Sequence, residues 1–124
     1  MTAYLVVGIG GFLGAISRYA IHVWILGRWG RVFPLGTFVI NVSGSFLIGF
    51  VMSILAARNI IDSQWRLFVV VGFLGGYTTF SAFEFEINSM LKQGEPYTAM
   101  LYIVLSVIVG FIALRIGDAA GKYI

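Results

Sequence analysis

The sequence predicts an all-α integral membrane protein with four transmembrane helices, and three observations support this fold class. Apolar side chains make up 60% of the 124 residues and charged ones only 10%, whereas a soluble domain carries about a quarter charged residues. The mean hydropathy is +0.98. The apolar residues also gather in four stretches separated by short polar links. Because one helix needs about 20 residues to cross the hydrocarbon, four spans nearly fill the chain.

The four stretches form one transmembrane domain over residues 1–124. The first stretch is interrupted only by Arg18 and His22. The turn before the last stretch contains Gly94 and Pro96, which do not continue a helix. Trp and Tyr residues lie near several segment ends, as is typical of membrane interfaces. The expected spans cover about residues 3–26, 35–57, 65–91 and 97–120.

The composition excludes a soluble enzyme, a nucleic-acid-binding protein and a disordered tail. The net charge of +3 comes from scattered basic residues, so neither nucleic acid nor a polybasic lipid contact is expected. Cysteine is absent, which rules out disulfides and thiolate metal sites. The one histidine, His22, has no evident nucleophile or metal partner, so no enzymatic activity is expected.

The basic residues are divided almost evenly between the two sides of the predicted bundle. Topology normally follows an excess of Lys and Arg in the cytoplasmic loops, and this chain has no such excess. It is therefore expected to insert in both orientations and to form an antiparallel, dual-topology homodimer, unless a partner protein fixes its orientation. The side of the termini holds Arg58, Arg66, Lys122 and Arg115, and the other side holds Arg28, Arg31, Lys92 and the membrane-embedded Arg18.

Small residues line one face of the first span. Gly11, Gly14, Ala15 and Arg18 follow at three- and four-residue spacing, and small residues let another helix approach closely. Arg18 stands well inside the span, where a charge is costly in lipid and usually faces a cavity or a partner. Either its fixed charge attracts anions at the mouth of a pore, or the side chain snorkels to the interface.

A polar stripe runs down the second span. Thr37, Asn41 and Ser45 are spaced by four residues, so they share one helix face. A mid-membrane asparagine offers two hydrogen-bond donors. Hydrogen bonding between packed helices is the plainer explanation of such a stripe when it is taken alone.

The third span contains the most unusual segment. Two adjacent glycines at 75–76 precede two threonines at 78–79, which makes a poor helix interior, so this helix is expected to be broken there. Unwound backbone at that depth must be buried in protein or line an aqueous cavity, and such breaks can bind ions. Close packing is the alternative role for the glycine pair.

Two aromatic rings follow the expected break. Phe80 and Phe83 share one helix face, and a phenyl edge carries partial positive charge that can solvate a small anion. Without further context, two phenylalanines in a membrane would be assigned to lipid or core contacts. Tyr102 and Ser106 on the fourth span could add two hydroxyls to a polar path.

Three motifs, in order along the chain, resemble those of the Fluc family of fluoride channels, also called CrcB. The resemblance covers the whole chain. It implies a channel through which fluoride leaves the cytoplasm passively, lowering its toxicity, in the bacterial plasma (inner) membrane. It also implies an antiparallel homodimer surrounded by membrane lipid. The motifs are Gly11-x-x-Gly14-Ala15-x-x-Arg18-Tyr19, Gly36-Thr37-x-x-x-Asn41-x-x-Gly44 and Gly75-Gly76-x-Thr78-Thr79-Phe80-Ser81-x-Phe83-x-x-Glu86.

The resemblance further implies roles for individual residues. Asn41 would hydrogen-bond the permeating fluoride, while Phe80 and Phe83 would supply ring edges along its path. Arg18 would lie towards an aqueous vestibule. A structural sodium ion would be held at the dimer axis by the backbone carbonyls of Gly75 and Thr78. The hydroxyl donors along the path would be those of Thr79, Ser81, Tyr102 and Ser106.

Two carboxylates complicate this assignment. Glu86 fits the family's motif and shares the helical face of Phe83, where it would repel an anion unless it is protonated, paired or able to swing aside. Glu84 is less expected, and we place it at a pore mouth or near a basic partner. Ala82 removes a hydroxyl that relatives often have at this position.

Two other functions are compatible with four short spans. A small dual-topology multidrug/proton antiporter needs a carboxylate in its first span, and this first span has none. A non-transporting assembly subunit would explain the glycine seams but would leave Asn41 and the two phenylalanines beside the break without a role.

Overall fold

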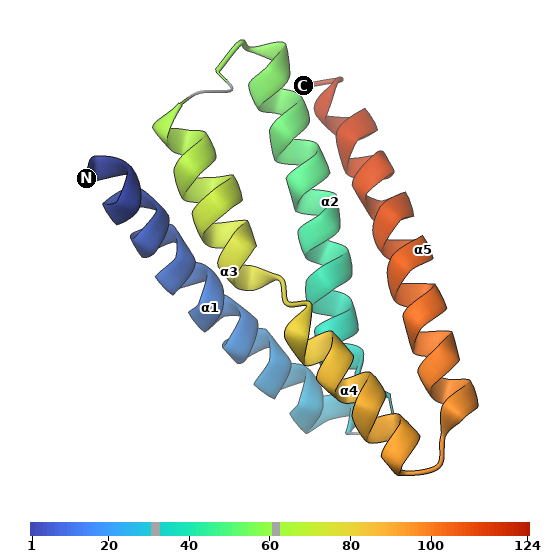
Figure 1. Ribbon diagram of the computed structural model, residues 1–124. Helices are drawn as coiled ribbons and strands as arrows, with labels where there is room; N and C mark the ends of the chain where they lie inside the picture. The colour runs from blue at the N-terminus through green and yellow to red at the C-terminus, as the bar shows by residue number, and fades with distance from the viewer. Residues whose placement is uncertain (31–32, 61–62) are drawn as a thin grey trace.

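The computed structural model describes residues 1–30, 33–60 and 63–124, and the described chain is helical, with no strand. Four long apolar helices confirm the prediction of an all-α, four-span membrane protein. The third is divided into several elements (Figure 1). The order of elements is α1 (Thr2–Trp29), α2 (Leu35–Ala57), η1 (Arg66–Leu74), α3 (Gly75–Tyr77), α4 (Ser81–Lys92) and α5 (Pro96–Gly121).

Both termini lie at the same end of the bundle, together with the end of α2 and the start of η1 (Figure 1). The other end holds the C-termini of α1 and α4. This arrangement separates the basic residues as the sequence predicts, with Arg58 and Lys122 at one end and Arg28 and Lys92 at the other. Arg31, which the prediction places with the second group, lies outside the described residues.

Glycines allow α1 to contact the third helix at the level of the backbone. A methyl group at Gly14 would overlap the Phe73 carbonyl, and one at Gly76 would come within 2.6 Å of the Gly11 carbonyl oxygen. A methyl group at Gly10 would likewise overlap the Phe68 carbonyl. Close backbone approach is the usual packing mode of membrane helices, because lipid provides no hydrophobic force to press them together.

The helices α2 and α5 form the other tight pair of the bundle. Gly117 lies where a side chain would overlap the Phe46 carbonyl, and a methyl group at Gly121 would come within 2.7 Å of the Phe50 carbonyl oxygen. The face of α5 that carries Gly117 and Gly121 is thus the face that contacts α2.

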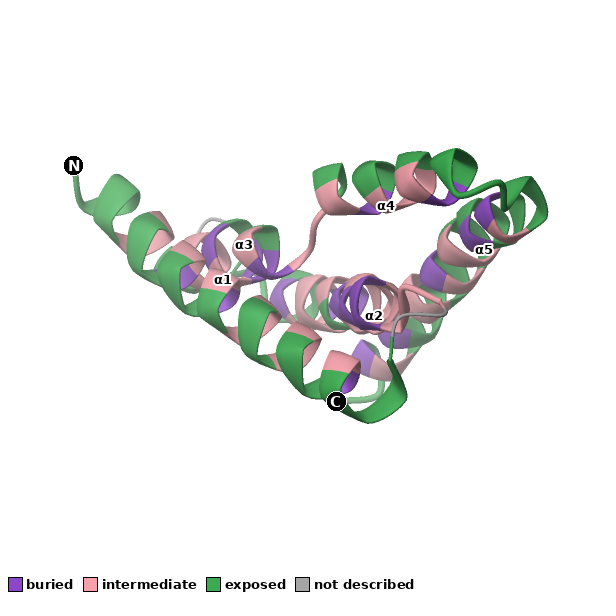
Figure 2. Ribbon diagram, turned by 90° about the horizontal axis from the view of Figure 1, so that it is seen from below, coloured by how far each residue is buried: buried purple, intermediate pink, exposed green. Residues whose placement is uncertain are grey.

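The short helix α4 turns away from α1 and α3 and lies beside α5 (Figure 2). Phe83 and Met90 from α4 pack with Ala99 and Tyr102 from α5 in one buried cluster. Many large apolar side chains on the outer faces are exposed, which is the surface that lipid covers in a membrane protein.

The interruption of the third helix lies in the later part of the predicted segment. Gly75 is helical (φ −63°, ψ −38°), and the backbone becomes extended at Thr78 (φ −82°, ψ 157°). The break thus begins at Thr78, inside the predicted segment, whereas the glycine pair itself remains helical and Gly76 serves the contact with α1. Before it, nine residues (Arg66–Leu74) form a π-helix, a rare conformation that is frequent at functional sites.

Candidate functional site

The non-helical segment at 78–80 is held by the side chain of Asn41. The Asn41 amide nitrogen donates to the Thr79 carbonyl at 2.9 Å, and the Asn41 amide oxygen accepts from the Thr79 N–H, also at 2.9 Å. Asn41 thus satisfies both main-chain polar groups of one residue that lies outside any helix. One hydrogen on its side-chain nitrogen is left over for another acceptor.

Because of this pairing and a second hydrogen bond, the carbonyl groups of Gly75 and Thr78 lack the N–H donors that they would have in a continuous helix. In a continuous helix, the N–H of Thr79 would reach the Gly75 carbonyl, and the N–H of Ala82 would reach the Thr78 carbonyl. Here the Thr79 N–H donates to Asn41, and the Ala82 N–H donates to the Thr79 hydroxyl at 3.3 Å. The two residues predicted to hold a cation through their carbonyls are therefore both among those that lose their usual helical donors at the interruption.

An open groove of about 330 Å³ lies against this segment. It brings together the polar groups of Asn41, Ser45, Thr78 and Thr79, and Gly75 also lines it. Its remaining lining is apolar and includes Phe80. Polar groups from the second and third spans, predicted separately from the sequence, thus share one surface.

Arg18 reaches from α1 to α3, just before the non-helical segment. Its Nε donates to the Gly76 carbonyl at 3.1 Å, and the residue is half-buried. The two interpretations offered by the sequence were a pore mouth and snorkelling to the interface, and neither predicted this contact. The vestibule role implied by the resemblance stays a prediction.

The two phenylalanines occupy different environments. Phe83 is buried, and its ring meets that of Tyr102 edge to face, with the ring centroids 4.9 Å apart. Phe80 is 69% exposed on the single chain. The centroids of Phe80 and Phe83 are 5.9 Å apart, so the structure brings the two rings together beside the interruption.

Glu86 is paired with two hydroxyl groups. Thr37 Oγ1 donates to one of its carboxylate oxygens at 2.9 Å, and the Tyr102 hydroxyl donates to the other at 2.9 Å. Pairing is one of the three alternatives that the sequence leaves for this carboxylate, but the sequence identifies no partner. Thr37 was already visible on the polar stripe of the second span, whereas its contact with Glu86 needs the tertiary structure.

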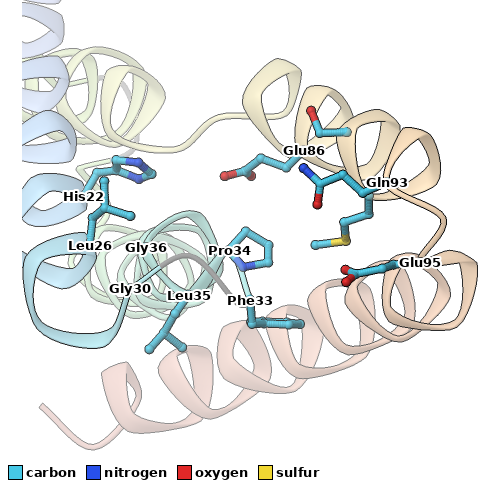
Figure 3. Close-up of a pocket in the computed structure, with 12 residues that line it drawn as sticks. His22, Leu26, Gly30, Phe33, Pro34, Leu35, Gly36, Glu86, Gln93 and Glu95 are labelled. Carbon is cyan, nitrogen blue, oxygen red and sulfur yellow. The ribbon is translucent and has the colours of Figure 1, made fainter.

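A larger pocket, of about 420 Å³, opens on the side of Glu86 that faces the end of the bundle. His22 from α1 and Glu86 from α4 both point into it, and Gln93 and Glu95 contribute to its rim (Figure 3). Phe33 and Met90 supply apolar lining.

The remaining predicted path residues are more scattered. Ser81 is exposed at the start of α4, and Glu84 is exposed further along it. The Ser106 hydroxyl is buried, and it has no hydrogen-bond partner among the residues that the structure describes. Tyr102 is fully buried and is engaged with Glu86. A single chain therefore does not line up all of the predicted hydroxyl donors around one channel.

The polar groups at the interruption are amides, hydroxyls, carbonyls and aromatic edges. In the described part of the chain, no three His, Cys, Asp or Glu residues lie together as a metal site would require. Four apolar spans with polar groups gathered at an interrupted helix define a small membrane transport protein, because backbone of this kind inside a membrane lines a cavity or is buried in protein.

Comparison with known proteins identifies the family. The family model described as CrcB-like protein, Camphor Resistance (CrcB), matches residues 5–118, and the chain belongs to this family. A relative from Acidobacterium capsulatum, named fluoride-specific ion channel FluC, is 46% identical over 98% of this chain and 97% of its own. Relatives of the same name from Chlorobium chlorochromatii (42%; 96% and 92% covered) and Geotalea daltonii (39%; both chains covered completely) are also similar.

Proposed function

We propose that this protein is a fluoride-selective channel that lets fluoride leave the cytoplasm down its gradient. The observation that carries the proposal is the match, over nearly the full length of both chains, to relatives named fluoride-specific ion channels. The match includes the interrupted segment and its partners. The antiporter interpretation is not supported, since the family is a channel family and residues 2–29 contain no Asp or Glu.

The chemistry of the site suits a small, strongly hydrated anion. Such an ion crosses only if donors replace its water shell, and it leaves again only if no donor binds it too firmly. Neutral donors meet both conditions better than a fixed cation. Asn41 keeps one N–H free, Thr79 and Ser81 offer hydroxyls, and Phe80 and Phe83 offer ring edges. Ser106 extends the set along α5, and Tyr102 would join it only when its hydroxyl releases Glu86.

Conduction requires two copies in this proposal. Phe80 is 69% exposed, and the groove beside Asn41 is open on the single chain. An antiparallel second copy would cover both, and it would bring its own polar segment to the same region. The even division of basic residues between the two ends of the bundle supports insertion in both orientations.

A structural sodium ion fits the same assembly. The usual helical donors of the Gly75 and Thr78 carbonyls are engaged elsewhere, and both residues line the open groove. Hard cations are bound by such oxygen atoms, and unwound helices supply them to sodium in transporters. Two carbonyls from one chain leave a cation undercoordinated, so the ion would also require the second copy. When bound, it would supply fixed positive charge that holds the two interrupted helices together.

The test is ion efflux from liposomes that contain the purified full-length protein. We expect fast fluoride release with negligible chloride release. Protein-free liposomes measure the background leak. Equal rates for the two ions, or no release of either, would contradict the proposed function.

A further inference from the structure

The interruption of the third helix creates a need for a hydrogen-bond donor at Gly76. In a continuous helix, the Phe80 N–H would donate to the Gly76 carbonyl. The helix ends at Tyr77 instead, and among the described backbone hydrogen bonds none reaches this carbonyl. At membrane depth no bulk water replaces the missing donor, so an unpaired carbonyl is costly.

Arg18 is positioned to supply that donor. Gly11 and Gly14 bring α1 against α3 at backbone distance, and Arg18 follows Gly14 by one helical turn on the same face. The donating atom is Nε, which is 3.1 Å from the Gly76 oxygen. This atom is the inner nitrogen of the guanidinium group rather than one of its two terminal nitrogens.

The non-helical segment is consequently held from two neighbouring helices. Arg18 binds Gly76 from α1, two residues before the segment begins, and Asn41 binds Thr79 within it from α2. Phe80 is the next residue along the chain. A shift of the Gly76 carbonyl would therefore move the segment that presents Thr79 and Phe80 to the groove.

We propose that Arg18 is a positioning residue, which caps the Gly76 carbonyl and thereby holds residues 78–80 in their conducting geometry. Its hydrogen bond, rather than its positive charge, is what conduction requires. The part of this inference that concerns conduction rests on the proposed fluoride channel. The part that concerns the geometry of residues 78–80 does not depend on which ion is transported.

Two substitutions separate the hydrogen bond from the charge. Arg18→Lys keeps the charge but places a methylene group where Nε lies. Arg18→citrulline, introduced by unnatural amino-acid incorporation, removes the charge and keeps an N–H at the Nε position. Arg115→Lys is the matched control, because Arg115 is exposed on α5 and far along the chain from the interruption.

Fluoride efflux is measured for each full-length variant in liposomes, and hydrogen exchange of the 78–80 amides is measured in detergent. For Arg18→Lys we expect fluoride flux to fall by about tenfold or more, because a hydrogen bond to a charged group is lost. Amide exchange at 78–80 should become faster. Arg18→citrulline should restore both the flux and the slow exchange, and Arg115→Lys should match the unmodified protein in both.

The opposite pattern, with flux kept by lysine and lost with citrulline, would show that Arg18 acts through its charge and would overturn the proposal. Unchanged exchange at 78–80 in Arg18→Lys would also overturn it, even if that variant conducts poorly. Should the unmodified protein release no fluoride, the proposed function fails, while the exchange measurement still decides whether Arg18 holds the segment.

Discussion

Asn41 and Thr79, which are 38 residues apart in the sequence, form a reciprocal pair in which the side-chain amide of one residue binds both main-chain groups of the other. A side-chain amide is suited to this contact, because it combines a donor and an acceptor in one plane. The pair fixes the interruption of the third helix, and it leaves one Asn41 N–H available. One residue can therefore both shape the proposed path and donate to the ion within it.

Replacing Asn41 with aspartate tests this double role. Asn41→Asp keeps the acceptor for the Thr79 N–H but places a carboxylate oxygen against the Thr79 carbonyl, and it adds negative charge to an anion path. We expect fluoride flux to fall to background in liposomes while the proposed dimer still forms on size-exclusion chromatography. Asn88→Asp, at an exposed position of α4, is the control. Flux at the unmodified rate in Asn41→Asp would remove this residue from the path.

The two phenylalanines should differ in what they contribute to stability. Phe83→Ile removes a buried ring that packs on Tyr102, so we expect loss of flux together with about 1 kcal/mol or more of destabilisation. Phe80→Ile should abolish flux with little change in thermal stability of the single chain, because Phe80 is largely exposed. Phe85→Ile is the matched control, since Phe85 is 70% exposed on α4, which follows Phe80 directly. Equal flux in Phe80→Ile and Phe85→Ile would contradict a role for the Phe80 ring.

The four spans could be predicted from the sequence because hydropathy and length alone determine which segments cross a membrane. The polar stripe was also visible locally, since Thr37 and Asn41 repeat with the helical period. What could not be predicted is which partner each polar group takes. The same glycine pair can unwind a helix or allow a second helix to approach, and here Gly76 does the latter because Gly11 faces it. Only the tertiary structure distinguishes these outcomes.

Helix contact through glycine can be tested at two positions of α1. Gly14→Ala would place a methyl group on the Phe73 carbonyl, whereas nothing lies within 4 Å of a methyl group at Gly8. We expect Gly14→Ala to cost about 1–3 kcal/mol and to lower the yield of folded protein. Gly8→Ala should be neutral or slightly stabilising, because alanine is the better helix former. Thermal unfolding in detergent measures both. Equal melting temperatures in the two variants would argue against backbone-level packing at Gly14.

Thr37 and Tyr102 both donate to the carboxylate of Glu86, so the effects of removing either hydroxyl on fluoride flux should depend on one another. Removing a donor with Thr37→Val or Tyr102→Phe leaves one carboxylate oxygen of Glu86 without its hydrogen bond and free to repel the anion, so we expect each variant to slow fluoride flux. Because both act on the same carboxylate, their effects should not add in the double variant. In a Glu86→Gln background, Tyr102→Phe should have a smaller effect than in the unmodified protein. A full, undiminished effect of Tyr102→Phe in that background would show that its hydroxyl acts independently of Glu86.

If the proposed sodium ion is part of the assembly, fluoride flux should require sodium, although sodium is not the ion transported. Gly75 and Thr78 both line the open groove, and the usual helical donors of their carbonyls are engaged elsewhere. In the proposed dimer, removing the cation would therefore leave these carbonyl oxygens of both chains without a partner. Liposomes prepared with sodium exhaustively replaced by N-methyl-D-glucamine should release fluoride much more slowly, and returning sodium should restore the rate. Chemical cross-linking of the dimer should weaken in parallel. Undiminished flux without sodium would exclude the ion from the conducting assembly, while the pairing of Asn41 with Thr79 would stand unchanged.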